Sequence, residues 1–316
     1  MNIDKLIGNT PIIKIRIKFN NKIKNIYAKL EYYNYTGSIK DRLVNYIITK
    51  SYETGELKKN MPIVEVSSGN TGISFAALGA FYHHPVHIFL PDWVSKERVK
   101  IMELYGAKVH YITHKDGGFI NAIKKADKLA LEIGGFRPNQ FSNELNVLAH
   151  YNGIGSEIVS EVSNIGAFVS GYGTGGTLIG IAKRLKEKDS KIKIVAMEPT
   201  NMSFLSDKPR KGIHQIEGIG DEFLPDLLDR SLIDKVITIS DSEALNMTQR
   251  LSKELGLGVG ISSGANFLAS SLIEEDNVVT VFADDSKKYL STNLTKKIDD
   301  DNLISNKIEF IDFSVL

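Results

Sequence analysis

The chain contains no cysteine among its 316 residues. Disulfides, cysteine-ligated zinc or iron–sulfur centres and a cysteine nucleophile are therefore excluded, and the composition suits a reducing compartment. An excess of charge of one sign is also lacking, because 39 Lys and Arg residues are balanced by 38 Asp and Glu residues. A net charge of +1 provides no global field for nucleic acid or a membrane surface, so we expect neither as a partner.

Long apolar segments are missing as well. The stretch at residues 72–81 falls well short of the ~20 residues that a membrane helix needs. The N-terminal residues lack the continuous apolar stretch and cleavage site of a signal peptide, so we expect a soluble, cytoplasmic protein. His83, His84 and His87 cluster near a predicted strand, but no carboxylate has helical spacing to them. We predict a polar turn there and no metal site.

What the sequence does contain is a regular alternation of β-branched runs and amphipathic segments. Alternating strands and helices predict an α/β protein with a mostly parallel sheet and ligands at the carboxyl ends of the strands. The length fits one large or two modest domains, and because no linker divides the chain, two domains would have to be interleaved. The predicted strands are 12–17, 25–30, 63–66, 86–90, 108–112, 167–170, 192–197, 236–239 and 278–282, and predicted helices include 95–105, 119–133, 178–187, 242–255 and 265–274.

Two glycine-containing loops follow predicted strands and precede helical stretches. The first, SSGNTG at residues 67–72, offers hydroxyls and backbone N–H groups at a helix start, which suit a small anion such as a carboxylate. The second, GYGTGGT at residues 171–177, lets the backbone approach an anion closely, and a phosphate is its natural ligand. Gly171, Gly173 and Gly176 followed by Glu198 also satisfy a dinucleotide-binding pattern, which is a weak alternative.

Two further segments carry polar groups at predicted helix starts. GISSGA at residues 260–265 offers hydroxyls and backbone N–H groups ahead of a helical stretch. Lys40, in TGSIKDR at residues 36–42, lies just inside a helix start, where the helix dipole opposes its charge. Such a lysine is a candidate for a lowered pKa and for nucleophilic amine chemistry, although a lone lysine is more often a surface residue.

Taken together, these motifs resemble the cysteine synthase / cystathionine β-synthase family of pyridoxal-phosphate enzymes, from GNTPI at Gly8 to YLST at residues 289–292. The resemblance implies the tryptophan synthase β-like α/β fold (fold type II), with two interleaved open twisted α/β domains. Residues 1–37 plus 143–316 would form the large cofactor-binding domain. Residues 38–142 would form a smaller mobile domain carrying the Schiff-base lysine and the substrate-carboxylate loop. A homodimer is the family expectation, and the dinucleotide alternative leaves Lys40 and two loops unexplained.

The resemblance also implies roles for individual residues. Lys40 would form the Schiff base with pyridoxal 5′-phosphate and act as general acid and base, and Asn70 would bind the ring 3′-oxygen. Ser262, with Ser263 as the fallback, would meet the pyridine nitrogen. The phosphate would lie against Gly173, Thr174, Gly175, Gly176 and Thr177, and the substrate α-carboxylate against Ser67, Ser68, Thr71 and Gln140.

The implied reaction is β-elimination or β-replacement on a small L-amino acid through an α-aminoacrylate, in sulfur amino-acid metabolism. The sequence departs from the family after GIG, where Asp221 and Glu222 are two consecutive acids. Cysteine synthases typically have small residues there, and cystathionine β-synthases have an aromatic residue followed by an acid. A carboxylate at the pocket would disfavour hydrosulfide by about 1–4 kcal/mol at about 4 Å. It could also act as a general base for a neutral nucleophile. Asp221 could instead point to solvent or cap the helix after Pro225.

We therefore expect release of hydrogen sulfide from L-cysteine, with water or a thiol as second nucleophile, giving L-serine or a thioether such as lanthionine. The alternatives are an O-acetylserine sulfhydrylase using O-acetyl-L-serine, or a cystathionine β-synthase using L-serine. A non-enzymatic binding protein on the same fold is disfavoured by the presence of Lys40.

Overall fold

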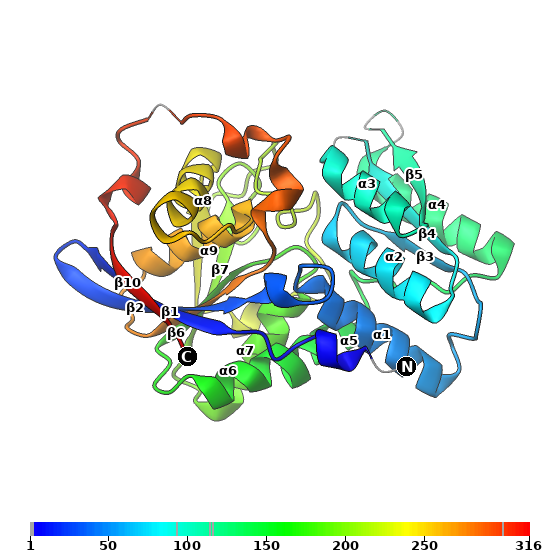
Figure 1. Cartoon of the computed structure of the whole chain (residues 1–316), viewed down its shortest axis with the longest axis horizontal. Helices are drawn as coiled ribbons and strands as arrows, with labels where there is room; N and C mark the ends of the chain where they lie inside the picture. The colour runs from blue at the N-terminus through cyan, green and yellow to red at the C-terminus, as the bar shows by residue number, and fades with distance from the viewer. Residues whose placement is uncertain (1–2, 93, 114, 116, 299) are drawn as a thin grey trace.

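Two twisted sheets organise the residues that the structure, a computed structural model, describes: 3–92, 94–113, 115, 117–298 and 300–316. One sheet has seven strands and the other has three, and Figure 1 shows them in two lobes placed side by side. We call the seven-stranded sheet with its helices the large lobe, and the three-stranded sheet with its helices the small lobe.

The strands of the large lobe form a mixed sheet. They are β1 (Ile12–Phe19), β2 (Lys22–Leu30), β6 (Ala167–Gly171), β7 (Lys193–Pro199), β8 (Lys235–Ile239), β9 (Val278–Phe282) and β10 (Glu309–Val315). The order is β10-β1-β2-β9-β6-β7-β8, antiparallel from β10 to β2 and parallel from β2 to β8. Every residue of β6 and β9 is buried, as expected for parallel strands covered on both faces.

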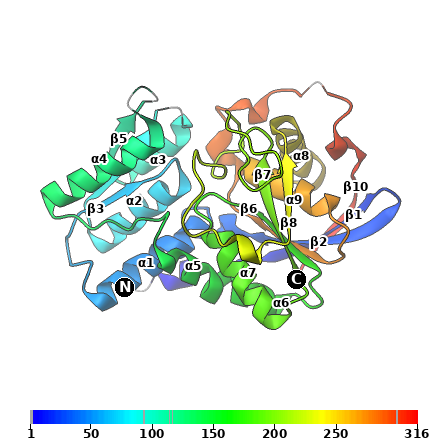
Figure 2. The same ribbon diagram turned by 180° about the vertical axis from the view of Figure 1, so that it is seen from behind.

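Helices cover both faces of this sheet (Figure 2). One face packs against α8 (Asp241–Leu255) and α9 (Ile261–Leu272), whose apolar residues form one core with β1, β2 and β9. The other face packs against α5 (Glu144–His150), a π-helical turn (Tyr151–Gly155), α6 (Ser156–Glu161) and α7 (Gly176–Lys188). Short 3₁₀ turns lie at Asp4–Leu6, Glu31–Tyr33, Arg230–Leu232, Ser286–Tyr289, Asn293–Thr295 and Ile304–Lys307.

The small lobe has a parallel sheet of order β3-β4-β5 with helices on both sides. Its elements are β3 (Ile63–Val66), β4 (Val86–Pro91), β5 (Lys108–Ile112), α1 (Lys40–Thr54), α2 (Asn70–Tyr82), α3 (Lys96–Leu104) and α4 (Gly118–Ile133). Apolar residues of α1, α2 and α3 form one core with this sheet, and α4 forms a second core on the opposite face. Because α1 also packs on α5 of the large lobe, it lies where the two lobes meet.

The predicted α/β class is confirmed, and all nine predicted strands are present with small differences at their ends. The terminal strand β10 was not predicted. The expectation that the 260–265 segment lies ahead of a helix is wrong, because α9 already begins at Ile261 and includes both serines. The boundaries 1–37 plus 143–316 and 38–142 stay a prediction. Across the described residues, no helix is both long and apolar enough to span a bilayer.

Candidate active site

A cavity between the lobes collects the loops that follow β3 and β6 and the first turns of α1 and α9. This is the carboxyl end of both parallel sheets, where α/β proteins bind ligands. The cavity brings together residues that are far apart in the chain and that the sequence analysis singled out. They are Lys40, Ser67, Ser68, Asn70, Thr71, Gln140, Gly173, Thr174, Gly175, Thr177, Asp221 and Ser262.

Lys40 is the first residue of α1, and its side chain lines the cavity. Burial lowers the pKa of its amine, while the negative charges of Asp284 and Asp221 act in the opposite direction. An amine with a lowered pKa is unprotonated more often, which is what a nucleophile or a proton acceptor requires.

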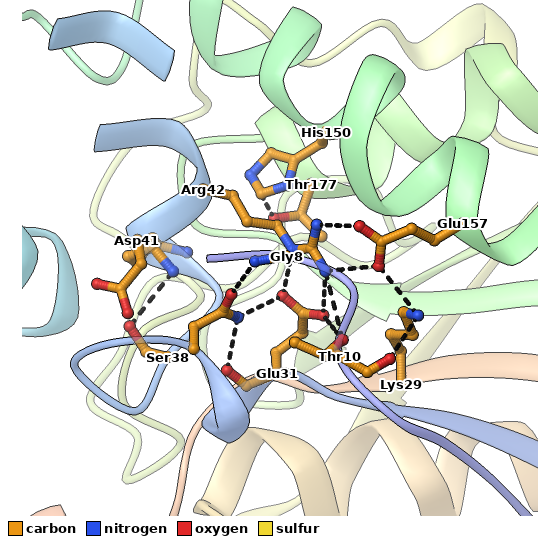
Figure 3. Close-up of polar contacts among 12 residues, drawn as sticks. Gly8, Thr10, Lys29, Glu31, Ser38, Asp41, Arg42, His150, Glu157 and Thr177 are labelled. Atoms are coloured by element: carbon orange, nitrogen blue, oxygen red, sulfur yellow. Dashed lines mark hydrogen bonds and ion pairs between the residues drawn. The ribbon is translucent and has the colours of Figure 1, made fainter. Parts of the chain in front are cut away.

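The helix start that carries Lys40 is fixed by a buried cluster of charges (Figure 3). The Arg42 guanidinium donates to Glu31 at 2.6 Å and to Glu157 at 2.6 Å, and Lys29 lies 3.0 Å from Glu157. Although burial alone would raise it, the pKa of Glu157 falls to about 2 because of Arg42 and Lys29. Both partners of Arg42 are well buried, so this cluster holds the beginning of α1 against the N-terminal strands.

The loop between β6 and α7 has the geometry of an anion cradle. Gly175 has φ +87°, in the left-handed region that glycine tolerates, and precedes the N-terminus of α7. A β-carbon on Gly176 would overlap the side-chain oxygen of Asn146. The Asn146 amide donates to Thr174 Oγ1 at 2.9 Å, which orients that hydroxyl. Backbone N–H groups and hydroxyls therefore surround a position for one anionic group.

A buried histidine supports the last residue of this cradle. Thr177 Oγ1 lies 3.2 Å from His150 Nε2 (Figure 3). Burial, aided by the charges of Lys40 and Arg42, lowers the pKa of His150 well below its usual range. The imidazole is therefore neutral at pH 7 and adds no positive charge to the cradle, where the N-terminus of α7 contributes positive potential.

Hydrogen bonds made by Ser67 and Thr71 hold the SSGNTG loop in its conformation. Ser67 Oγ accepts hydrogen bonds from the N–H groups of Gly69 at 3.1 Å and Gly72 at 3.0 Å, so this hydroxyl shapes the loop. Thr71 Oγ1 donates to Gln140 Oε1 at 2.7 Å, and Gln140 Nε2 donates to the backbone of β3 at 2.6 Å. The loop is therefore pre-shaped before any ligand binds.

Asn70 and Ser262 face the cavity from opposite lobes. The Asn70 side-chain nitrogen donates to Asp284 Oδ2 at 2.7 Å, and the Asn70 side-chain oxygen is buried without a partner among the described residues. Ser263 Oγ accepts a hydrogen bond from the Ala283 N–H at 3.0 Å, whereas Ser262 lines the cavity. Of the two serines, Ser262 is therefore the one placed to contact a ligand.

Asp221 closes the site on the large-lobe side. It lines both this cavity and an adjoining outer chamber of about 500 Å³. A β-carbon on Gly173 would lie 3.5 Å from Asp221 Oδ2, so the carboxylate reaches the cradle. Burial raises the pKa of Asp221 to about 6; Lys40 acts against this rise and Glu222 adds to it. The site thus pairs a carboxylate with an amine across a half-enclosed space.

Comparison with known proteins agrees with this geometry. A family model described as "Pyridoxal-phosphate dependent enzyme" matches residues 3–284. The chain belongs to this family. A cysteine synthase from Helicobacter pylori is 41% identical over 302 residues, covering 91% of this chain and 96% of the relative. Cysteine synthase B from Campylobacter jejuni is 39% identical over 298 residues, covering 92% and 97%.

Among solved structures, a hydrogen sulfide-producing enzyme from Fusobacterium nucleatum is similar over almost its whole length. It is 44% identical with a TM-score of 0.95, and the match covers 99% of this chain and 97% of that chain. These similarities confirm the predicted tryptophan synthase β-like fold and the cofactor, pyridoxal phosphate. The reaction is a β-replacement or β-elimination of cysteine metabolism on a small amino-acid substrate.

The residues present fit pyridoxal phosphate. The cradle would hold one phosphate, Lys40 lies on the cavity wall, and the Ser262 hydroxyl, which also lines the cavity, would meet a ring nitrogen. The dinucleotide alternative needs Glu198 free to bind a ribose. The Glu198 carboxylate instead accepts hydrogen bonds from the Tyr172 hydroxyl and from the backbone of Phe204 and Leu205. Glu198 therefore stabilises a loop of this pyridoxal-phosphate enzyme.

Sequence reasoning missed several residues of this pyridoxal-phosphate site. Asp284 is 1% exposed and accepts hydrogen bonds from Asn70 and from the Tyr289 hydroxyl, both at 2.7 Å. Its place two residues after the end of β9 was the available signal, because polar residues at the carboxyl ends of parallel strands commonly face the ligand. Arg98, from α3, pairs with Glu217 at the border of the same cavity. Nothing comparable in the sequence around Arg98 indicated that this residue would border the site.

Proposed function

We propose that this enzyme releases hydrogen sulfide from L-cysteine and adds a second, neutral nucleophile at the same carbon. The Cβ–S bond breaks and sulfur leaves as hydrogen sulfide. The oxygen of water then bonds to Cβ and gives L-serine, or a thiol sulfur bonds there and gives a thioether such as lanthionine. The observation that carries the proposal is the Asp221 carboxylate facing Lys40 beside the glycine cradle.

The cofactor and the substrate are assigned to the residues that line the cavity. Pyridoxal phosphate, when bound, supplies the electron sink that makes the Cα proton of an amino acid removable. Lys40 holds the cofactor covalently, Asn70 faces the ring oxygen and Ser262 faces the ring nitrogen. The phosphate is assigned to Gly173, Thr174, Gly175 and Thr177, which line the cavity, and to Gly176 between them. The substrate carboxylate is assigned to the loop of Ser67, Ser68 and Thr71 with Gln140.

Two groups divide the proton transfers between them. The Lys40 amine, with its lowered pKa, accepts the proton from Cα of the substrate. The Asp221 carboxylate, with a pKa of about 6, is mostly ionised at neutral pH and accepts a proton from the incoming water or thiol. Its negative charge also disfavours hydrosulfide, which is an anion, as the second nucleophile.

The similarity to the hydrogen sulfide-producing enzyme supports this reaction, and the similarity to cysteine synthases supports the alternative. In that alternative O-acetyl-L-serine loses acetate and sulfide is the second nucleophile. A cystathionine β-synthase using L-serine is a further alternative. The homodimer and the cytoplasmic location expected for the family stay predictions.

Replacement of Asp221 by asparagine tests the proposal. Asp221→Asn preserves shape and removes the proton acceptor, so steady-state turnover of L-cysteine should fall by about 10²- to 10⁴-fold. The first release of sulfide, which depends on Lys40, should persist as a burst of about one equivalent per active site. Sulfide release and L-serine formation are measured on the holoenzyme by rapid quench.

Asp226→Asn is the matched control, because Asp226 is exposed five residues further along the same segment. Undiminished turnover of L-cysteine by Asp221→Asn would show that Asp221 is not the proton acceptor. Turnover of O-acetyl-L-serine with sulfide, and none of L-cysteine, would instead identify the enzyme as a cysteine synthase.

A further inference from the structure

The segment that carries Asp221 begins in the large lobe and ends against the small lobe. Near its start, the N–H of Gly220 donates to the carbonyl oxygen of Tyr172 at 3.0 Å, which ties it to the loop after β6. At its end, the Phe223 ring lies against Phe119 and Phe141, with ring centroids 6.2 and 5.1 Å apart. These rings belong to the core between α4 and the small sheet, so Phe223 packs against the small lobe.

Between these two anchors, Glu222 lies against the N-terminus of α4. A β-carbon placed on Gly118 would be 3.3 Å from Glu222 Oε2 and 3.8 Å from Oε1. A side chain at residue 118 would crowd this carboxylate. Gly118 also has φ +58°, a left-handed conformation that favours glycine. The carboxylate therefore lies beside the first residue of α4.

The first turn of α4 contains no acidic residue. Its N-cap is Gly117, which has no side chain, and its first turn, Gly118 to Asn121, contains neither Asp nor Glu. A helix N-terminus attracts negative charge because its first N–H groups are unpaired and its dipole points there. Glu222 brings a carboxylate from the other lobe to this first turn.

We propose that Glu222 is a positioning residue for proton transfer: its carboxylate, held at the N-terminus of α4, fixes the adjacent Asp221 over the cavity. The backbone of Asp221 then has a large-lobe anchor on one side and a small-lobe anchor on the other. Asp221 keeps its place only while the small lobe is docked. This inference rests on the proposed role of Asp221 and adds a role for the second acidic residue after GIG.

The charges around Asp221 decide what removal of Glu222 does to the pH profile. Lys40 faces Asp221 from α1, and Glu222 adjoins it on the same segment. Arg98, Glu217 and His214 border the same outer chamber. Because Glu222 is a like charge, its removal makes ionisation of Asp221 easier, and the acidic limb of the rate profile moves to lower pH.

Glu222→Gln in the holoenzyme tests the proposal, because it preserves the size of the side chain and removes its charge. We expect kcat for L-cysteine to fall roughly tenfold through misplacement of Asp221, with KM unchanged within about a factor of two. Amide hydrogen exchange in the first turn of α4 should become about two- to fivefold faster, since the helix start loses its carboxylate. Mass spectrometry of peptides covering 117–123 reports this exchange.

Glu132→Gln is the matched control, because Glu132 is exposed near the opposite end of α4. A wild-type kcat or wild-type exchange at the start of α4 in Glu222→Gln would each overturn the inference. Failure of the proposed function looks different, because it appears as full L-cysteine turnover by Asp221→Asn. If Asp221→Asn is impaired while Glu222→Gln behaves as wild type, the proposed function stands and the positioning role falls.

Discussion

Removal of the Glu157 charge should weaken the fold in a strongly pH-dependent way. Glu157 accepts from Arg42 and lies 3.0 Å from Lys29, with its side chain only 13% exposed. Its folded-state pKa of about 2 lies below the ordinary 4.5, so the folded state favours the ionised form. A pKa difference of this size corresponds to about 3 kcal/mol of stability at neutral pH.

The pH window follows from the sign of the shift. Above about pH 5 the carboxylate is ionised in both states and the full stabilisation is present; as pH falls towards 2, the folded state also takes up a proton and the stabilisation is lost. At pH 3 about half, roughly 1.5 kcal/mol, should remain. Glu157→Gln should therefore differ from wild type by about 3 kcal/mol at pH 7 and progressively less in acid.

Urea-induced unfolding followed by circular dichroism at pH 7, 5, 4 and 3 measures this difference. The control is Glu132→Gln, whose partner Lys128 is a solvent-exposed neighbour on one helix turn. That pair should contribute no more than about 0.5 kcal/mol at any of these pH values. A difference for Glu157→Gln that stays constant from pH 7 to pH 3 would refute the electrostatic reasoning, because loss of packing alone has no such pH dependence.

Two further predictions concern the cavity. Gly176→Ala should weaken cofactor binding by at least about tenfold because its β-carbon overlaps Asn146, and titration of the visible absorbance of the holoenzyme measures this. Gly106→Ala, at an open surface turn with a left-handed φ of +86°, should cost some stability but bind the cofactor normally. The rate of L-cysteine turnover should rise about tenfold per pH unit below pH 6 and level off above it, because Asp221 with its pKa of about 6 must be ionised to accept a proton. The Asp221→Asn variant should lose this rise in rate below pH 6. If the rise persists in that variant, a group other than Asp221 causes it.

Local patterns in the sequence were sufficient to predict most of the fold. The apolar runs of β6 and β9 are buried on both faces, so their sequence pattern and their environment agree. Strand β10 escaped prediction because it is an exposed edge strand, and what holds it is pairing with β1, nearly 300 residues earlier. A partner so distant leaves no trace in a local pattern.

The same contrast applies to the site. Glycine loops after strands predicted the cradle and the SSGNTG loop, because backbone geometry depends on nearby residues. Arg98 could not be predicted, because its meaning depends on Glu217 and on the Tyr289 ring, 4.7 Å from its guanidinium carbon. Ser67 was assigned to the substrate, yet its hydroxyl accepts two hydrogen bonds within its own loop. Spacing alone does not distinguish these two uses of a serine.

The hydrogen bond from Asn70 to Asp284 has a consequence for the rates at which ligands enter and leave the site. At 2.7 Å, it joins the first turn of a small-lobe helix to the segment after β9, beside the cavity that Asn70 lines. A hydrogen bond to a charged group contributes about 1.5–3 kcal/mol, which corresponds to roughly a ten- to hundredfold bias in an equilibrium. If residues 38–142 move as predicted, opening of the site would have to break this bond, and substrate entry and product departure would both slow by that factor.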